Sequence, residues 1–161
     1  MIKAFIFDLD GVIVDTAKYH FIAWNELAKQ FGFEITVHQN EQLKGVSRVK
    51  SLDLILEWGN IDLDQAQKDL LLVQKNKTYL EFINTLSKSD ILPGIVDVLN
   101  YLKSKKIAIA LGSASKNAVP ILEKLEIDAL FDAIIDGNVV EKAKPNPEVF
   151  LKAADKLGIM P

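Results

Sequence analysis

Three short runs of apolar residues predict the strands of a sheet. They are Ile2–Phe7 (IKAFIF), Ile107–Leu111 (IAIAL) and Ala133–Ile135 (AII). A strand with one solvated face alternates between apolar and polar residues, whereas these runs are nearly continuous. Because continuous apolar character is typical of strands covered on both faces, the pattern favours a buried parallel sheet.

Amphipathic helices alternate with these strands in the second half of the chain. Their apolar residues recur three and four positions apart and therefore share one helix face. Such stripes are formed by Ile95, Val98, Leu99 and Leu102, by Val119, Leu122 and Leu125, and by Phe150, Ala153, Ala154 and Leu157. Strand–helix alternation with short connections predicts an α/β fold with a doubly wound parallel core of the Rossmann-like type.

A purely helical segment interrupts this alternation after the first strand. Its apolar stripes consist of Phe21, Trp24, Leu27, Ala28 and Phe31 and of Leu52, Ile55 and Leu56. Ser47 is placed to cap the second of these helices and Gly59 follows it, while residues 64–86 predict one long helix or two shorter ones. We therefore predict a helical domain at residues 17–88, inserted into a core formed by residues 1–16 and 89–161.

The predicted core has a thin sheet. The sequence ends with Gly158-Ile159-Met160-Pro161, just after a helix, where an α/β fold normally begins another strand. Three strands make a small sheet, and the first run is more apolar than is usual for an edge strand. We therefore expect a core that is incomplete at its C-terminal end.

Composition and charge exclude several classes of protein. Of the 161 residues 49% are apolar, and the formal net charge of −3 gives no electrostatic reason to expect nucleic-acid binding. There is no cysteine, so disulfides and thiolate metal sites are excluded. No run approaches the roughly 20 apolar residues of a membrane helix. We expect a cytoplasmic globular protein, monomeric, with no nucleic-acid or membrane partner.

The first strand leads directly into a pair of carboxylates, Asp8 and Asp10, followed by Gly11 and, further on, Asp15. The carboxyl end of a parallel sheet is where α/β proteins bind ligands. Asp8 and Asp10 can share Mg²⁺, whose charge would relieve their mutual repulsion. One carboxylate could then attack a phosphoryl group while the other moves a proton. Taken by itself, the dipeptide Asp10-Gly11 is explained better by a simple turn.

Two further segments favour phosphate chemistry. Ser113 to Asn117 follow the second strand and offer hydroxyl and N–H groups to a phosphate, although an ordinary helix cap would have the same composition. Lys144 follows the third strand in a loop stiffened by Pro145 and Pro147, although a Lys-Pro pair is more often only a surface feature. An acid pair, a serine and a lysine at the ends of successive strands form a much more specific pattern than any one of them.

These motifs resemble those of the haloacid dehalogenase (HAD) superfamily of phosphoryl-transfer enzymes. Its first motif matches Phe7–Gly11 (FDLDG), its second matches Ser113 and its third matches Lys144-Pro145. The inserted helices resemble the small cap domain of one branch. The details are most similar to the β-phosphoglucomutases, on the segments DLDGVIVDTAKYHFIAW (8–24), NEQLKGVSR (40–48), LPGI (92–95) and GSASKN (112–117).

The resemblance implies a role for each matched residue. Asp8 would be the nucleophile that becomes an aspartyl phosphate, and Asp10 the general acid/base, with both contributing to the Mg²⁺ site. Ser113, the Ala114 amide and Lys144 would hold the transferring phosphoryl group. The remaining matches would contact substrate: Gly45, Val46, Ser47 and Arg48 on the cap, and Ser115, Lys116 and Asn117 on the core.

Two cap residues also match but fit a structural role at least as well. Trp24 lies on the apolar stripe and is expected in the core of the helical domain, and His20 lies beside that stripe. The resemblance implies that His20 contacts substrate. Thr16, just before the cap, lies where a hinge is expected.

The activity implied is a Mg²⁺-dependent phosphomutase that interconverts β-D-glucose 1-phosphate and glucose 6-phosphate through a bisphosphate intermediate. The alternatives are a phosphatase of small sugar phosphates and an inactive, truncated phosphate-binding fragment. The second alternative arises because the family's fourth motif, an acidic pair on a later strand that supplies a metal ligand, has no match before Pro161. Asp132 and Asp136 flank the third strand but do not match that motif.

Overall fold

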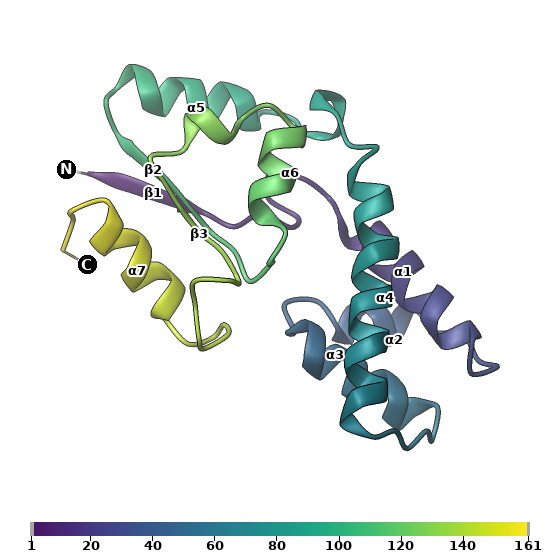
Figure 1. Ribbon diagram of the computed structural model, residues 1–161. Helices are drawn as coiled ribbons and strands as arrows, with labels where there is room; N and C mark the ends of the chain where they lie inside the picture. The colour runs from purple at the N-terminus through teal and green to yellow at the C-terminus, as the bar shows by residue number, and fades with distance from the viewer. Residues whose placement is uncertain (1, 161) are drawn as a thin grey trace. The chain divides into compact units, whose positions relative to one another are not determined.

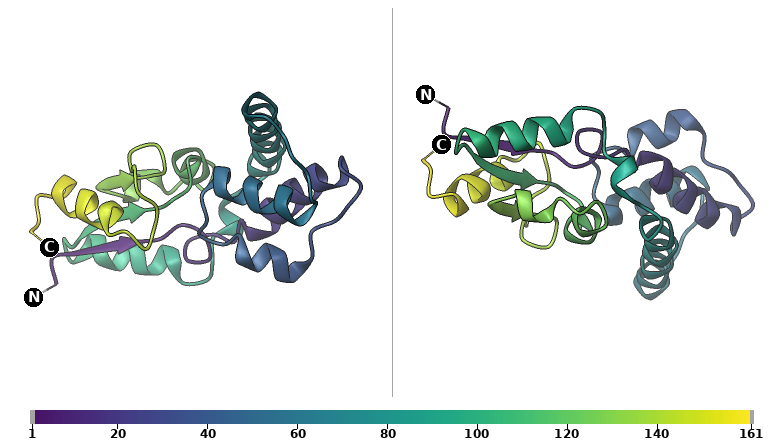
Figure 2. Two further views of the ribbon diagram at one scale, coloured as in Figure 1. Left: turned by 90° about the horizontal axis from the view of Figure 1, so that it is seen from below. Right: turned by 90° about the horizontal axis from the view of Figure 1, so that it is seen from above.

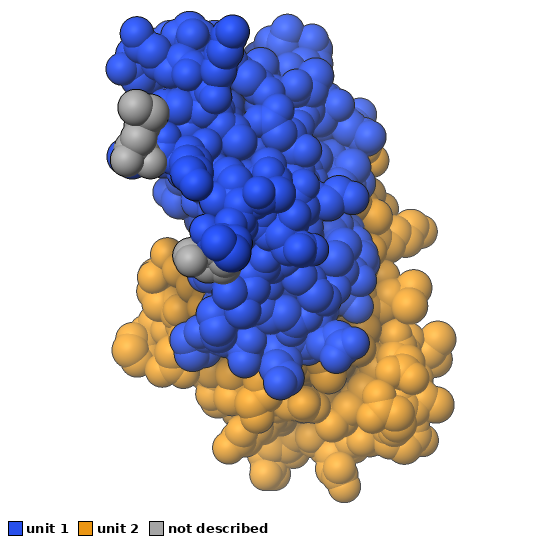
Figure 3. Space-filling model, turned by 90° about the vertical axis from the view of Figure 1, so that its left-hand side faces the viewer, with its two compact units in different colours: residues 1–16, 86–161 blue, residues 17–85 orange. Residues whose placement is uncertain are grey.

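The computed structural model describes residues 2–160, which form two compact units (Figure 3). Unit 1 contains residues 1–16 and 86–161, and unit 2 contains residues 17–85. The second boundary therefore lies between Thr85 and Leu86, slightly before the position expected from the sequence. No helix in the described part of the chain is long and apolar enough to cross a membrane.

Unit 1 is built on a parallel three-stranded sheet (Figure 1). Its strands are β1 (Ala4–Phe7), β2 (Ala108–Gly112) and β3 (Ala133–Ile135), in the spatial order β1-β2-β3. All three lie within or next to the apolar runs, so the predicted parallel α/β sheet is confirmed. Phe7 pairs with Leu111, and Gly112 pairs with Ile135. This register brings the three strands to an end at nearly the same level, which places the residues that follow them at one edge.

Three helices of unit 1 coincide with the predicted stripes. They are α5 (Ile95–Ser104), α6 (Ala118–Lys124) and α7 (Glu148–Lys156), with short 3₁₀ helices at Lys88–Asp90 (η1) and Asp128–Leu130 (η2). However, Val98, Val119 and Phe150, at 43%, 36% and 43% exposed, lie at the solvent side of those stripes. Figure 2 shows α5 and α7 on opposite faces of the sheet, and both pack against β2. The core between α7 and the sheet contains Ala110, Ala133, Ile135, Val149 and Ala153.

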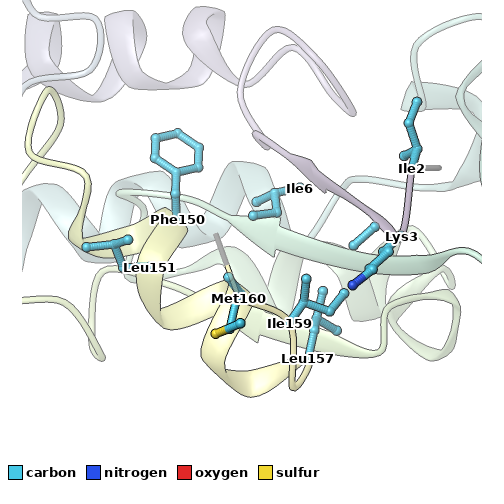
Figure 4. Close-up of a pocket in the computed structure, with 10 residues that line it drawn as sticks. Ile2, Lys3, Ile6, Phe150, Leu151, Leu157, Ile159 and Met160 are labelled. Atoms are coloured by element: carbon cyan, nitrogen blue, oxygen red, sulfur yellow. The ribbon is translucent and has the colours of Figure 1, made fainter.

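Strand β1 departs from the expected burial. It pairs with β2 alone among the described residues, so it lies at the edge of the sheet, and Phe5 is 39% exposed. Beside it is a mainly apolar groove of about 440 Å³, lined by Ile2, Ile6, Phe150, Leu157 and Met160 among others (Figure 4). The strand is thus as apolar as predicted, but one of its two edges has no partner strand among the described residues.

Unit 2 consists of four helices: α1 (Ala17–Lys29), α2 (Val37–Gln42), α3 (Arg48–Trp58) and α4 (Gln65–Ile83). Helix α4 is one long helix and packs against α1 and α3. The core of this unit contains Trp24, Leu27, Ala28, Leu52, Ile55 and Leu56. The predicted stripes therefore face the core, and Trp24, only 3% exposed, is a core residue as expected.

Candidate active site

The acidic segment after β1 folds into a compact turn. The carbonyl oxygen of Leu9 accepts hydrogen bonds from the N–H groups of Ile13 (2.9 Å) and Val14 (3.2 Å), and the N–H of Gly11 donates to the carbonyl of Val14 (2.8 Å). Gly11 has a φ of +76°, which other residues rarely adopt. The side chains of Leu9, Ile13 and Val14 are fully buried. The apolar residues between the acids thus anchor the turn and leave Asp8 at the carboxyl edge of the sheet.

The side chain of Asp10 is held in place by a hydrogen bond from Thr16. The hydroxyl of Thr16, which is fully buried, donates to Oδ1 of Asp10. Burial raises the pKa of Asp10 above its ordinary value, while the Thr16 hydrogen bond lowers it and the nearby carboxylates of Asp8 and Asp15 raise it. The net shift of the Asp10 pKa is upward, which is the direction expected of a carboxyl group that donates a proton.

Asp8 faces a cation from the third loop. The ammonium group of Lys144 lies 3.1 Å from Oδ1 of Asp8 and donates a hydrogen bond to the carbonyl of Gly112 at 2.9 Å. The same oxygen of Asp8 accepts the N–H of Leu9 at 2.8 Å. Two residues that the sequence pattern assigned to one site, Asp8 and Lys144, are therefore in direct contact.

The loop between β2 and α6 is organised by its own serine hydroxyls. Oγ of Ser113 accepts the N–H of Ser115 at 3.0 Å, and Oγ of Ser115 accepts the N–H of Asn117 at 3.2 Å. Ser113 is buried and its N–H donates to the carbonyl of Ile135 at 2.9 Å, which extends the ladder between β2 and β3 by one step. This loop, residues 113–117, is called the serine loop below.

The serine loop lies at the same sheet edge as the acids, because strand register aligns the strand ends. Within residues 2–160 the N–H of Ala114 has no hydrogen-bond acceptor, and the residue is exposed. An exposed backbone N–H beside a serine hydroxyl and a lysine ammonium is suited to the oxygens of a phosphoryl group.

The loop that carries Lys144 is fixed by Glu148, at the start of α7, which sequence analysis did not select. Its carboxylate accepts the N–H groups of Glu141 (3.0 Å) and Lys142 (2.8 Å) and forms an ion pair with Lys152 (2.7 Å). The hydrogen bond from Lys152 and those two N–H groups lower the pKa of Glu148 to about 2. An acid at the first turn of a helix, shortly after the Lys-Pro pair, was the available signal.

The candidate cap residues surround the start of α3 in unit 2. Gly45 has a φ of +74°, the N–H of Val46 donates to the carbonyl of Leu43 (3.2 Å), and Ser47 is the N-cap of α3, as predicted. Oγ of Ser47 accepts the N–H of Lys50 at 3.3 Å. Arg48 is half-buried, and burial lowers the pKa of its guanidinium. The segment thus presents a cation beside a helix N-terminus.

His20 belongs to a cluster that contains a buried lysine. The ammonium group of Lys75 lies 2.8 Å from Nδ1 of His20 and over the rings of Trp24 and Tyr79, at 4.6 Å and 4.7 Å from their centroids. The rings of His20 and Tyr79 stack at 4.1 Å. Burial, followed by the charges of Lys75 and Arg48, lowers the pKa of His20 to about 3. Because a lysine only donates, Nδ1 accepts and the ring proton is on Nε2.

The predicted residues therefore fall into two sets. Asp8, Asp10, Ser113 to Asn117 and Lys144 share one sheet edge in unit 1, whereas His20 and Gly45 to Arg48 lie in unit 2. Among the residues that the structure describes, no three acidic or histidine side chains are grouped as a metal site. The donors present are carboxylate oxygens, the ligands that Mg²⁺ prefers, so Asp8 and Asp10 fit a partial site for this ion.

Comparisons with known proteins identify the family of the chain. A family model described as haloacid dehalogenase-like hydrolase matches residues 2–161. The chain is 45% identical over 161 residues to the β-phosphoglucomutase of Bacillus subtilis, and the match covers 99% of this chain and 71% of that protein. It is 30% identical over 156 residues to a fructose-1-phosphate phosphatase of Escherichia coli, over 97% of this chain and 80% of that protein.

A solved structure shows the same similarity. The crystal structure of β-phosphoglucomutase from Clostridium difficile matches with a TM-score of 0.93 and 47% identity, over 99% of this chain and 72% of that one. The relatives thus include both mutases and a phosphatase, and the two mutases share more identity with this chain than the phosphatase does.

Proposed function

Because the chain belongs to the haloacid dehalogenase-like hydrolase family, we propose that it is a phosphomutase that interconverts β-D-glucose 1-phosphate and glucose 6-phosphate. The observation that carries the proposal is the contact of Asp8 with Lys144 beside the serine loop. The 45% identity to the Bacillus subtilis enzyme supports the choice of reaction and substrate.

In the first half-reaction, a carboxylate oxygen of Asp8 forms a bond to phosphorus as the bond to the departing sugar oxygen breaks. Asp10 gives its proton to that oxygen, which its raised pKa favours. In the second half-reaction, the C6 hydroxyl of β-D-glucose 1-phosphate attacks the aspartyl phosphate, Asp10 takes up its proton, and the Asp8 carboxylate is released with glucose 1,6-bisphosphate as the product. In the first half-reaction this bisphosphate is the phosphoryl donor, and its C1 oxygen leaves as part of glucose 6-phosphate.

The phosphoryl group needs positive partners throughout this transfer. Lys144 supplies a charge next to Asp8, and Ser113 with the Ala114 N–H supplies hydrogen-bond donors from the neighbouring loop. Asp8 and the backbone carbonyl of Asp10 would hold Mg²⁺, which when bound offsets the negative charge that carboxylates and phosphate bring together.

The cap residues would recognise the part of the substrate that does not react. Arg48 can bind a second phosphate by a fork of two hydrogen bonds, and its lowered pKa reflects a position partly shielded from water. Gly45, Val46 and Ser47 present backbone and hydroxyl groups next to it. On the core, Ser115, Lys116 and Asn117 would contact the sugar, and His20 would present its Nε2–H.

The test is to incubate the 161-residue protein with β-D-glucose 1-phosphate, a trace of glucose 1,6-bisphosphate and Mg²⁺, and to follow the products by ³¹P NMR. Accumulation of glucose 6-phosphate supports the mutase. Release of inorganic phosphate instead identifies the phosphatase suggested by the Escherichia coli relative. If neither forms while phosphate still binds, the chain acts only as a phosphate-binding domain.

Two variants, each with a matched control variant, separate these outcomes from artefacts. Asp8→Asn should abolish both turnover and the phosphoenzyme, whereas Asp155→Asn removes an exposed carboxylate on α7 and should change neither. Arg48→Ala should destroy mutase activity but only weaken a phosphatase. Lys50→Ala is its control, because the side chain of Lys50 is exposed and only its backbone N–H takes part in the cap, as a donor to Oγ of Ser47.

A further inference from the structure

The turn after β3 is bound to the serine loop by two hydrogen bonds. The N–H of Gly137 donates to the carbonyl of Ser115 at 3.1 Å, and Nδ2 of Asn138 donates to the carbonyl of Lys116 at 2.9 Å. Sequence analysis assigned no function to Gly137 or Asn138. Both acceptors are backbone carbonyl groups of the serine loop, which is proposed to hold phosphate and sugar. The turn therefore contacts the loop's backbone and not its side chains.

Gly137 also packs directly against the first peptide of that loop. A Cβ atom at this position would lie 2.3 Å from the carbonyl oxygen and 3.0 Å from the carbonyl carbon of Ala114. Real Cβ atoms essentially never approach other atoms to 2.3 Å, and the obstacle is backbone, which cannot rotate away as a side chain can. Only glycine therefore allows this approach of the two loops.

The close approach determines which way the peptide between Ala114 and Ser115 faces. In a planar trans peptide the C=O and N–H groups point in opposite directions. Since the carbonyl of Ala114 faces Gly137, the N–H of Ser115 points away from it, where it meets Oγ of Ser113 at 3.0 Å. Gly137 thus acts through this peptide on the hydroxyl of Ser113.

Asn138 is itself held in place by a buried acid. The carboxylate of Asp136, only 6% exposed, accepts the backbone N–H of Asn138 and its Nδ2, both at 2.9 Å. The side-chain amide is therefore oriented toward the carbonyl of Lys116 by two fixed contacts. Asp136, which did not match the family's acidic motif, has a structural task here.

We propose that Gly137 and Asn138 are positioning residues for the phosphate-binding loop. Gly137 fixes the orientation of the Ala114–Ser115 peptide and, through it, the Ser113 hydroxyl. Asn138 fixes Lys116. The link to phosphate binding rests on the function proposed above, whereas the effect on the peptide does not.

The experiment compares wild type with Gly137→Ala and Asn138→Ala by amide hydrogen exchange detected in ¹⁵N NMR spectra. In Gly137→Ala the Ser115 amide should exchange about tenfold faster or more, because it loses its acceptor. The Ser113 amide, bonded to Ile135, is the internal reference and should stay protected. Val139→Ala is the matched control, because this neighbouring residue is 48% exposed and only its backbone takes part in the turn.

The same samples are then titrated with inorganic phosphate. Gly137→Ala should weaken phosphate binding about tenfold, while Asn138→Ala should weaken glucose 6-phosphate binding more than phosphate binding. Unchanged exchange of the Ser115 amide in Gly137→Ala would overturn the proposed peptide orientation. Faster exchange with unchanged phosphate affinity would overturn the link to ligand binding.

Failure of the proposed function has a different signature. If wild type itself binds no phosphate, the serine loop is not a phosphate site and the link to ligand binding is wrong. The exchange data still decide whether Gly137 orients the peptide, since they require no ligand. If all variants lose protection throughout unit 1, including the Ser113 amide, the turn is needed for folding and the specific positioning role is refuted.

Discussion

The ammonium group of Lys144 lies 3.1 Å from Oδ1 of Asp8 and 2.9 Å from the carbonyl oxygen of Gly112. Asp8 follows β1, Gly112 ends β2 and Lys144 comes from the loop after β3. One cation thus connects the carboxyl ends of all three strands. A charge held in this way by the protein is already oriented when the substrate binds, which reduces the reorganisation needed for the reaction.

The first prediction concerns this cation. Lys144→Met keeps most of the side-chain volume but removes the charge, so phosphorylation of Asp8 by glucose 1,6-bisphosphate should slow by about 100-fold or more. The free energy of unfolding should change by less than about 1 kcal/mol, because the pair is partly exposed. Intact-protein mass spectrometry measures the phosphoenzyme, and urea denaturation measures stability.

The matched control is Lys142→Met, in the same loop. The side chain of Lys142 is exposed, and only its N–H is used, as a donor to Glu148. In Lys142→Met, Asp8 should be phosphorylated at the wild-type rate. Equal rates for Lys144→Met and wild type would remove Lys144 from the proposed site.

Much of the fold was predictable because local pattern and tertiary structure agree. The run Ala133–Ile135 is strand β3 itself, and the stripe containing Trp24 and Leu27 faces the core of unit 2. The family resemblance stated from FDLDG, Ser113 and Lys144-Pro145 is confirmed by the family match. For the strand and the helical stripe a single physical rule, burial of apolar residues at a regular spacing, decides the outcome.

Other features depend on contacts that the sequence pattern does not contain. Helix α2 has six residues, too few for a periodic stripe, and its visible signal was the capping box of Thr36 and Gln39. Lys75 is 2% exposed, although lysine is rarely buried, and its position depends on the rings of Trp24 and Tyr79. The approach of Gly137 to Ala114 joins two loops, which no local rule predicts.

The second prediction follows from the lowered pKa of His20. The unfolded chain takes up a proton near pH 6.5, whereas folded His20 does so only near pH 3. Between these values the unfolded state binds more protons, so stability rises with pH and is lost as the pH falls from 6.5 toward 3. One proton corresponds to about 1.4 kcal/mol per pH unit. His20→Gln should remove this dependence, measured as wild type minus variant in urea titrations from pH 4 to pH 7.

The other histidine of the chain provides the control. His38 is exposed on α2, so His38→Gln tests the loss of an imidazole away from the Lys75 cluster. If wild type and His20→Gln keep a constant difference across this pH range, His20 does not titrate as described.

A third prediction separates the two causes of that pKa. Lys75→Met should keep the packing on Trp24 and Tyr79 while removing the charge next to Nδ1. The pKa of His20 should then rise above about 3 but stay below 6.5, because burial is the larger cause. NMR titration of the imidazole carbons measures it. Lys77→Met, on an exposed part of α4, should leave the titration unchanged, and an equal effect of both variants would contradict a specific contact.

The fourth prediction concerns Glu148 and the loop that carries Lys144. Glu148→Gln should make the amides of Glu141 and Lys142 exchange faster, because a carboxylate accepts these hydrogen bonds more strongly than an amide oxygen. The pKa of Glu148 is lowered to about 2, so its contribution to stability is present above about pH 4.5 and is lost as the pH falls toward 2. The variant should therefore be less stable than wild type at pH 6, and the two should converge as the pH falls to about 2.

The control for Glu148→Gln is Glu141→Gln, since the side chain of Glu141 is exposed and only its N–H contacts Glu148. If the loop fixed by Glu148 also orients Lys144, Glu148→Gln should slow phosphorylation of Asp8 less than Lys144→Met does, because the charge is still present. Glu148→Asp keeps the carboxylate on a shorter side chain and therefore tests the geometry of these two hydrogen bonds. A rate for Glu148→Gln equal to wild type, despite faster exchange of both amides, would mean that Lys144 is held by Asp8 and Gly112 alone.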